Sequence, residues 1–141
     1  MLVPSLAWSW QPNVICGNGE YTHWEELPVD YSVNTSGADV GETTFLDAVE
    51  RSFGYWHEPC CSGATAATPR TTNLSALSNG DGASVIGFSG GYWPNELGDP
   101  QSTLGVTLIH YWTTCEITEA DIVFNNTYNN FCFSACGARD I

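Results

Sequence analysis

The sequence predicts an α/β fold in which a twisted mixed sheet of about five strands packs against one long helix. Apolar and polar residues alternate over 103–126, which indicates an antiparallel hairpin because successive side chains of a strand point to opposite faces. Residues 44–57 carry apolar side chains at helical spacing, whereas 27–34 and 83–89 are rich in β-branched and aromatic residues. The order strand, helix, strand, strand and hairpin is typical of an α/β unit with a mixed sheet.

The first predicted strand lies at 27–34, where Val29, Tyr31 and Val33 alternate with polar residues. After the helix, a stretch of small and polar residues at 64–71 predicts a weak second strand. Both segments are short, as expected for strands of a small domain.

The helix expected over 44–57 begins with a capping box, in which Thr44 is followed three residues later by Asp47. Its apolar residues recur at spacings of four, four and three and form one face: Phe45, Val49, Phe53 and Trp56. Pro59 ends the helical pattern. We expect the apolar face to pack against the sheet.

The remaining strands lie in the second half of the chain. Residues 83–89 predict a short buried strand, and the hairpin that follows divides into 104–112 and 117–125. The polar break at 113–116 is short enough to join two antiparallel neighbours. Residues 125–141 are expected to form a loop.

The charge balance is strongly acidic: 16 Asp and Glu face three Arg and no Lys, which gives a net charge of −13. Nucleic acid and anionic membranes are excluded as partners, because phosphate binding needs a cationic face. Calcium stays open as a ligand, since it prefers oxygen donors, and Glu96 and Asp99 are the candidates for it. Two acids on a surface loop are usually only solvated, and solvation is the favoured interpretation of the acidity.

Six cysteines predict disulfides and an oxidising, extracellular compartment. They are Cys16, Cys60, Cys61, Cys115, Cys132 and Cys136. Fifteen pairings exist for six cysteines, and the sequence does not choose among them. A zinc cluster is the alternative, but no C-x-x-C spacing occurs.

Residues 1–26 are expected to be a leader, consisting of a signal-peptide remnant and a lead-in loop. Small-x-small patterns at 5–7 and 7–9 resemble cleavage sites, although a basic region does not precede them. A flexible N-terminus is the other interpretation. No stretch of the sequence is long enough to span a bilayer as an apolar helix.

The segments LGVTLIHYW at 104–112 and EITEADIVFN at 116–125 resemble the fourth and fifth strands of matrixin-type zinc metallopeptidases of the metzincin group, especially bacterial secreted members. The resemblance spans about residues 27–141. It implies that the fourth strand is the antiparallel edge of the sheet and the upper rim of the active-site cleft. In that family the fifth strand leads to a helix with the zinc motif H-E-x-x-H-x-x-G-x-x-H.

This zinc motif is absent from residues 1–141. The resemblance therefore implies that 27–141 is the N-terminal part of a catalytic domain, inactive alone, with zinc ligands and general base beyond Ile141. No catalytic or metal-binding residue is assigned within the chain. Its histidines are isolated from one another in sequence: His23, His57 and His110.

The resemblance also implies a substrate-binding edge, because an exposed edge strand offers unpaired N–H and C=O groups to an extended peptide. The residues expected to bind the peptide are Leu104, Gly105, Val106 and Thr107. Gly105 would let the peptide backbone approach closely. The expected partner is a peptide or protein substrate, and the chain is expected to be monomeric.

Two other functions remain open. The sequence GFSGG at 87–91 has the G-x-S-x-G spelling of a serine hydrolase, but a nucleophile elbow needs a helix directly after it, and 92–95 has no helical pattern. The second is a complete secreted, disulfide-bonded module that binds carbohydrate or protein. Exposed aromatic residues would form its binding surface: Tyr92, Trp93 and Trp112.

Overall fold

The computed structural model describes residues 16, 19–38, 40–57, 65–132 and 139–140 of the chain. Its main sheet consists of β1 (Ser32–Asn34), β2 (Arg70–Thr71), β3 (Val85–Phe88), β4 (Gly105–Tyr111) and β5 (Ile117–Phe124). The helices are α1 (Glu42–His57) and a short 3₁₀ turn, η1 (Asn95–Leu97). A second, two-stranded sheet pairs β6 (Phe131–Cys132) with β7 (Arg139–Asp140).

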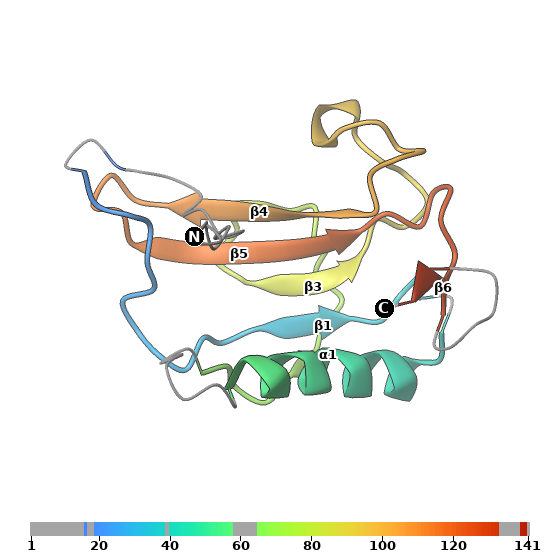
Figure 1. Cartoon of the computed structure of the whole chain (residues 1–141), viewed down its shortest axis with the longest axis horizontal. Coiled ribbons are helices and arrows are strands. Elements are labelled where there is room, and N and C mark those ends of the chain that lie inside the picture. Colours follow the sequence, from blue (N-terminus) through green and yellow to red (C-terminus); the bar gives the residue numbers. More distant parts are fainter. Residues whose placement is uncertain (1–15, 17–18, 39, 58–64, 133–138, 141) are drawn as a thin grey trace, which may run out of the picture.

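The main sheet has the strand order β2-β1-β3-β5-β4. Strands β2, β1, β3 and β5 run parallel to one another, and β4 pairs antiparallel with β5 at one edge. Figure 1 shows α1 running alongside β1, on the side away from β4. The predicted α/β fold, with a five-stranded mixed sheet, an antiparallel edge strand and one long helix, is confirmed.

The apolar face of α1 forms the first core cluster with β1 and β3. Phe45 and Val49 are buried on the helix, and the Phe45 ring lies 4.9 Å from that of Phe88. On the sheet side, Tyr31 and Val33 complete this cluster, as their alternation predicted. The helical face is therefore confirmed for the residues whose side chains are described.

The predicted start of the helix is wrong by two residues. Helix α1 begins at Glu42, and the amide of Phe45 donates to the Gly41 carbonyl at 3.0 Å. Thr44 is therefore already inside the first turn and does not cap it. Glycine is tolerated at an N-cap, and the acidic Glu42 in the first turn complements the helix dipole.

A second core cluster lies on the opposite face of the sheet, beneath the 73–101 segment. It joins Val85 and Val123 to Ala76 and Trp93. Trp93 is only 5% exposed, and its Nε1–H donates to the Gly98 carbonyl at 3.0 Å. The prediction of Trp93 as an exposed binding residue is therefore wrong, because the loop folds this ring onto the sheet.

The C-terminal segment also differs from expectation. Residues 131–132 and 139–140 pair in parallel as β6 and β7 instead of forming a loop. Asp140 therefore lies in a strand. The Phe131 ring packs 5.6 Å from Phe88, which ties this segment to the first core cluster.

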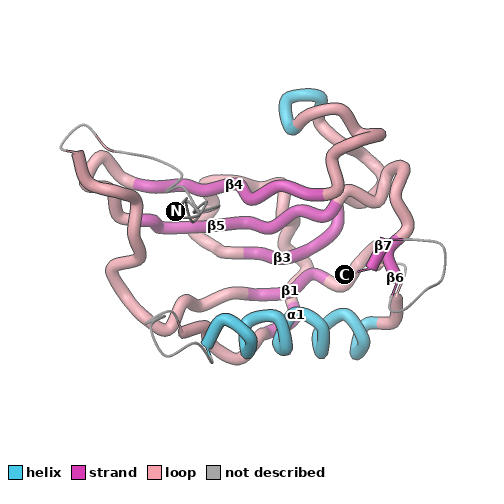
Figure 2. The backbone as a smooth tube through the Cα atoms, viewed as in Figure 1, coloured by secondary structure: helices cyan, strands magenta, loops and turns pink. Residues whose placement is uncertain are grey.

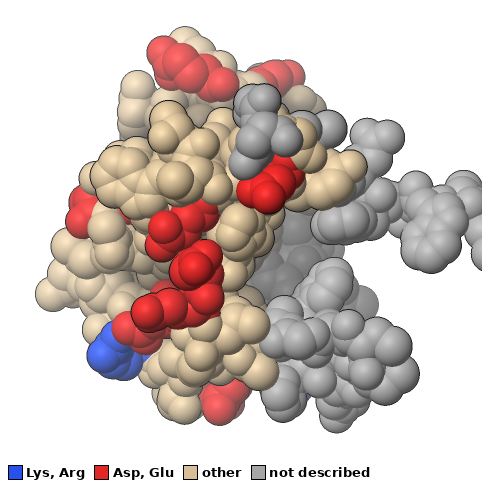
Figure 3. All heavy atoms as spheres, turned by 90° about the vertical axis from the view of Figure 1, so that its left-hand side faces the viewer, with Lys and Arg blue, Asp and Glu red and all other residues tan. Residues whose placement is uncertain are grey.

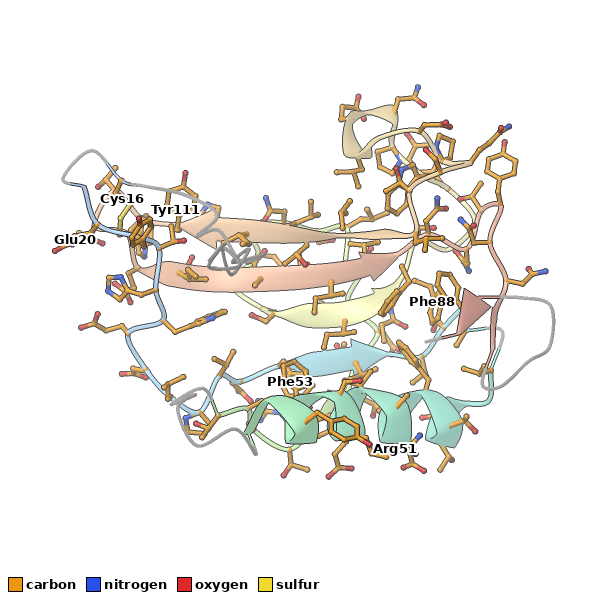
Figure 4. The ribbon with its side chains drawn as sticks, in the orientation of Figure 1. Cys16, Glu20, Arg51, Phe53, Phe88 and Tyr111 are labelled. Atoms are coloured by element: carbon orange, nitrogen blue, oxygen red, sulfur yellow. A yellow bond between two sulfur atoms is a disulfide. The ribbon has the colours of Figure 1, made fainter. Side chains whose placement is uncertain are left out.

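A disulfide joins Cys16 to Cys115, two residues separated by 99 positions. Cys115 is fully buried in the turn of the β4–β5 hairpin, and His23 and Glu116 form an isolated bridge nearby. Figure 4 shows Cys16 and Tyr111 at this same end of the molecule. The side chains of the other four cysteines lie outside the described residues.

Substitution Cys16→Ser should lower the free energy of unfolding by about 2–5 kcal/mol, because the crosslink restricts a long loop of the unfolded chain. Urea denaturation at neutral pH measures this change. The double substitution Cys16→Ser, Cys115→Ser is the control, since either change breaks the same bond and the two effects should not add. A double variant twice as destabilised as the single one would contradict this account.

Candidate peptide-binding edge

Strand β4 is the outermost strand of the main sheet, as Figure 2 shows. Within the part of the chain that the structure describes, β4 pairs with β5 along one side and with no strand along the other. Leu104 is 38% exposed directly before the strand, and Gly105 and Thr107 are exposed within it. Val106 is half-buried against the second core cluster.

The register decides which backbone groups of β4 face outward. The amide of Asn125 donates to the Leu104 carbonyl at 2.8 Å, so Leu104 directs its backbone carbonyl toward β5. In an antiparallel pair the bonded and non-bonded positions alternate, and therefore Val106 also faces β5. The outward N–H and C=O groups belong to Gly105, Thr107 and Ile109.

Two of the four residues predicted to bind a peptide, Gly105 and Thr107, thus direct their backbone groups outward. Leu104 and Val106 lie in the same segment but use theirs within the hairpin. Ile109 was missed, although the period of two that identified the strand runs through it.

Gly105 has a structural reason that differs from the predicted one. A Cβ atom added at this position would lie 2.8 Å from the Val123 carbonyl oxygen, closer than real side chains come to backbone. The glycine therefore permits the close approach of β5, and the hairpin itself requires it.

Asn125 positions the start of the edge strand, a role that the sequence pattern did not reveal. Its side chain is fully buried, and its Nδ2 donates to the carbonyls of Pro100 and Thr103 at 2.8 and 2.7 Å. Both acceptors belong to the loop that leads into β4. A buried amide with these partners fixes where the exposed edge begins.

The described residues contain no group of three His, Cys, Asp or Glu side chains placed to hold a metal ion. His110 bonds to the Thr118 hydroxyl at 3.0 Å, and a hydrogen bond with the Tyr21 carbonyl raises the pKa of the exposed His23. Asp99 accepts from the Gln101 amide and so caps a local turn. These residues do not fit a zinc site, and we derive no zinc-dependent step from them.

The serine of the G-x-S-x-G sequence is also unsuited to nucleophilic catalysis. Ser89 is 7% exposed, and its hydroxyl donates to Asn126 Oδ1 at 2.9 Å. A turn follows β3 directly, and the next helical element is the 3₁₀ turn η1. Residues 87–91 therefore form a strand end followed by a glycine-rich turn, which differs from a nucleophile elbow.

An apolar groove lies between α1 and the part of the sheet that the helix leaves uncovered. It consists of two adjoining hollows of about 310 and 190 Å³, which share Phe53, Ile86 and Ile122. Thr107 of the edge strand lines the larger hollow. The groove thus runs from α1 to the back of the β4 edge.

A separate hollow of about 440 Å³, distinct from the apolar groove, lies where β1, β3 and β5 begin. Its lining is acidic and includes Glu25, Glu26 and Glu116, together with an ion pair between Asp30 and Arg70. Figure 3 shows acidic side chains spread over this end of the molecule. The local charge disfavours an anionic ligand there.

The aromatic residues predicted for a binding module do not form one surface. Tyr92 and Trp112 are 68% and 58% exposed, but they are separated by the length of β4, which spans about 20 Å. Trp93 is buried between the loop and the sheet and does not join the two rings.

Compared with protein-family models, curated proteins and solved structures, the chain matches none of them. Within the described ranges, no helix combines the length and apolar character needed to cross a membrane.

Substitution Gly105→Ala should destabilise the fold by about 1–3 kcal/mol, because the added methyl group meets backbone that cannot rotate away. Gly54→Ala is the matched control, since open space surrounds that position on the exposed side of α1. It should stabilise the fold by about 0.5–1 kcal/mol through helix propensity. Urea denaturation measures both, and equal effects of the same sign would refute the role assigned to Gly105.

Proposed function

We propose that the outer edge of β4 binds an extended peptide, and that this chain supplies the sheet scaffold and cleft rim of a secreted, zinc-dependent endopeptidase of the matrixin type. The complete enzyme would hydrolyse peptide bonds with a zinc-activated water. Its zinc ligands and general base would lie beyond Ile141. The observation that carries the proposal is the row of outward backbone groups on an antiparallel edge strand.

Three residues of β4 define the length of peptide that the edge accommodates. Gly105, Thr107 and Ile109 each offer one donor and one acceptor, and they span about 13 Å along the strand. A bound peptide would therefore pair over about four or five residues. Backbone pairing of this kind supplies affinity without selecting a sequence.

Charge adds a preference among such peptides. With a net charge of −13, the chain repels acidic peptides and attracts basic ones. The Cys16–Cys115 disulfide supports secretion, because disulfides persist in oxidising compartments and are rare in the cytosol.

The apolar groove beside α1 gives independent support for a domain with a further helix. Apolar surface of this extent is usually covered by another element, and an amphipathic helix following Ile141 fits a groove bounded by α1 and the sheet. We expect the coding sequence after Ile141 to continue in frame into an H-E-x-x-H motif within about 40 codons, roughly one βαβ-sized unit. A stop codon directly after Ile141 would contradict the proposal.

Substitution Thr107→Pro tests peptide binding by this chain directly. Proline removes one outward N–H and is tolerated on the free side of an edge strand, so the hairpin should persist while binding weakens about tenfold or more. The probe is a mixture of capped, uncharged hexapeptides. Binding is followed by the amide resonances of Gly105, Thr107 and Ile109 in the unsubstituted protein and of Gly105 and Ile109 in the variant.

Thr107→Val is the matched control, because it keeps the β-branched shape and the amide while removing only the hydroxyl. It should bind the probe as the unsubstituted protein does. Peptide-induced shifts that map to another part of the molecule would refute the assigned edge. Equal affinity of the proline variant would do so as well.

A further inference from the structure

Two acidic side chains lie inside the protein on the face of β5 that points away from α1. Glu119 is 0% exposed and Asp121 is 1% exposed. Strand alternation places both side chains on the same face as Val123, and Val123 belongs to the second core cluster. Two buried carboxyl groups on one face are unfavourable unless hydrogen bonds or protons compensate them.

The segment 79–85 supplies that compensation through its backbone. The amides of Gly80 and Gly82 donate to the two carboxylate oxygens of Glu119. The amide of Val85 donates to Asp121 Oδ1 at 2.8 Å. The carboxyl pair thus fastens this segment to β5 through three backbone N–H groups.

One oxygen remains without compensation. Asp121 Oδ2 is buried and has no hydrogen-bond partner. Burial is the main cause that raises the pKa of Asp121 to about 6; the Val85 amide opposes this rise, whereas the charges of Glu119 and Asp81 add to it. A proton on this oxygen removes one buried negative charge.

Few charged side chains are placed to compensate the negative charge of Asp121 in place of a proton. Leu108 stands opposite Asp121 across the hairpin, and His110 stands opposite Glu119 with its Nδ1 at 3.0 Å from the Thr118 hydroxyl. The chain has no lysine. Arg51 lies on α1, beyond the other face of the sheet, and Arg70 pairs with Asp30.

We propose that Glu119 and Asp121 form a proton-binding carboxyl pair, which makes the attachment of the 79–85 segment to the sheet depend on pH. The pair lies directly behind the edge strand, because Leu108 and His110 of β4 stand opposite it. Loss of the proton leaves two charges facing each other in the core and weakens the packing that supports β4.

The direction of the pH effect follows from the raised pKa of Asp121. Folding takes up a proton wherever the folded group is protonated and the unfolded group, with its ordinary value of 3.8, is not. The stabilising contribution is therefore fully present below the unfolded value and is lost as the pH rises through about 6. When the pH is lowered from 7.5 to 5.0, protonation of Asp121 should raise the folding equilibrium constant about tenfold.

The experiment compares urea denaturation at pH 7.5 and pH 5.0 for the unsubstituted protein, Asp121→Asn and Asp47→Asn. The side chain introduced by Asp121→Asn cannot ionise. The change in the folding equilibrium constant between the two pH values should therefore be about tenfold smaller in this variant than in the unsubstituted protein. Asp47 is exposed on α1, and its substitution removes one negative charge without touching the pair. The Asp47 variant should keep the full response, and equal responses of all three proteins would overturn the proposal.

A second measurement does not depend on any variant. The carboxyl ¹³C resonance of Asp121 in the unsubstituted protein should titrate with a midpoint of about 6. A midpoint at or below the ordinary aspartate value of 3.8 would overturn the proposal, whatever the stability data show.

Discussion

The pairing of β5 with β4 on one side and with β3 on the other is the constraint on which the rest of the structure depends. Both faces of β5 make packing contacts near its C-terminal end, through Phe45 and Phe88 against Phe124 and through Trp93 against Val123. Because both edges and both faces of β5 are engaged, its register cannot shift without moving buried groups to solvent. That fixed register determines which backbone groups of β4 remain free.

Alternation in the sequence was sufficient to predict the hairpin and its two faces, because a period of two reports directly on which side chains are buried. It also predicted the apolar face of α1, since Phe45 and Val49 recur at helical spacing. The edge position of β4 came from a resemblance to known proteases and not from the pattern. A strand pattern does not say how many neighbours a strand has.

The errors arose where a residue's partner is distant in sequence or supplied by the backbone. Trp93 looked like an exposed loop residue because its burial depends on Val85 and Val123, which the loop sequence does not specify. The burial of Glu119 was not predicted from the sequence, since the amides that bind it belong to Gly80 and Gly82, 39 and 37 residues earlier in the chain. The capping-box prediction was wrong because the helix begins at Glu42, directly after Gly41. Thr44 therefore lies within the first turn and not at the cap.

A free edge strand is a hazard, because its unpaired N–H and C=O groups can pair with any extended chain and promote aggregation. Native proteins usually block such an edge with charges, bulges or short strands. Strand β4 has seven residues, and its register shifts at His110 and Tyr111, beyond the outward groups of Gly105 and Thr107. The irregularity thus limits the far end of the strand but leaves the proposed binding positions regular.

The same strand connects the free edge to the apolar groove. Thr107 directs its backbone outward, whereas its side chain lines the hollow beside Ala120 and Ile122. An element that fills the groove would pack behind Thr107 and hold the strand in place without covering its outward groups. Occupation of the groove would therefore stiffen the edge and reduce the entropy lost when a peptide pairs with it. Thr107 thus belongs to both the edge and the groove, and under the proposed function a helix in the groove would strengthen peptide binding at the edge.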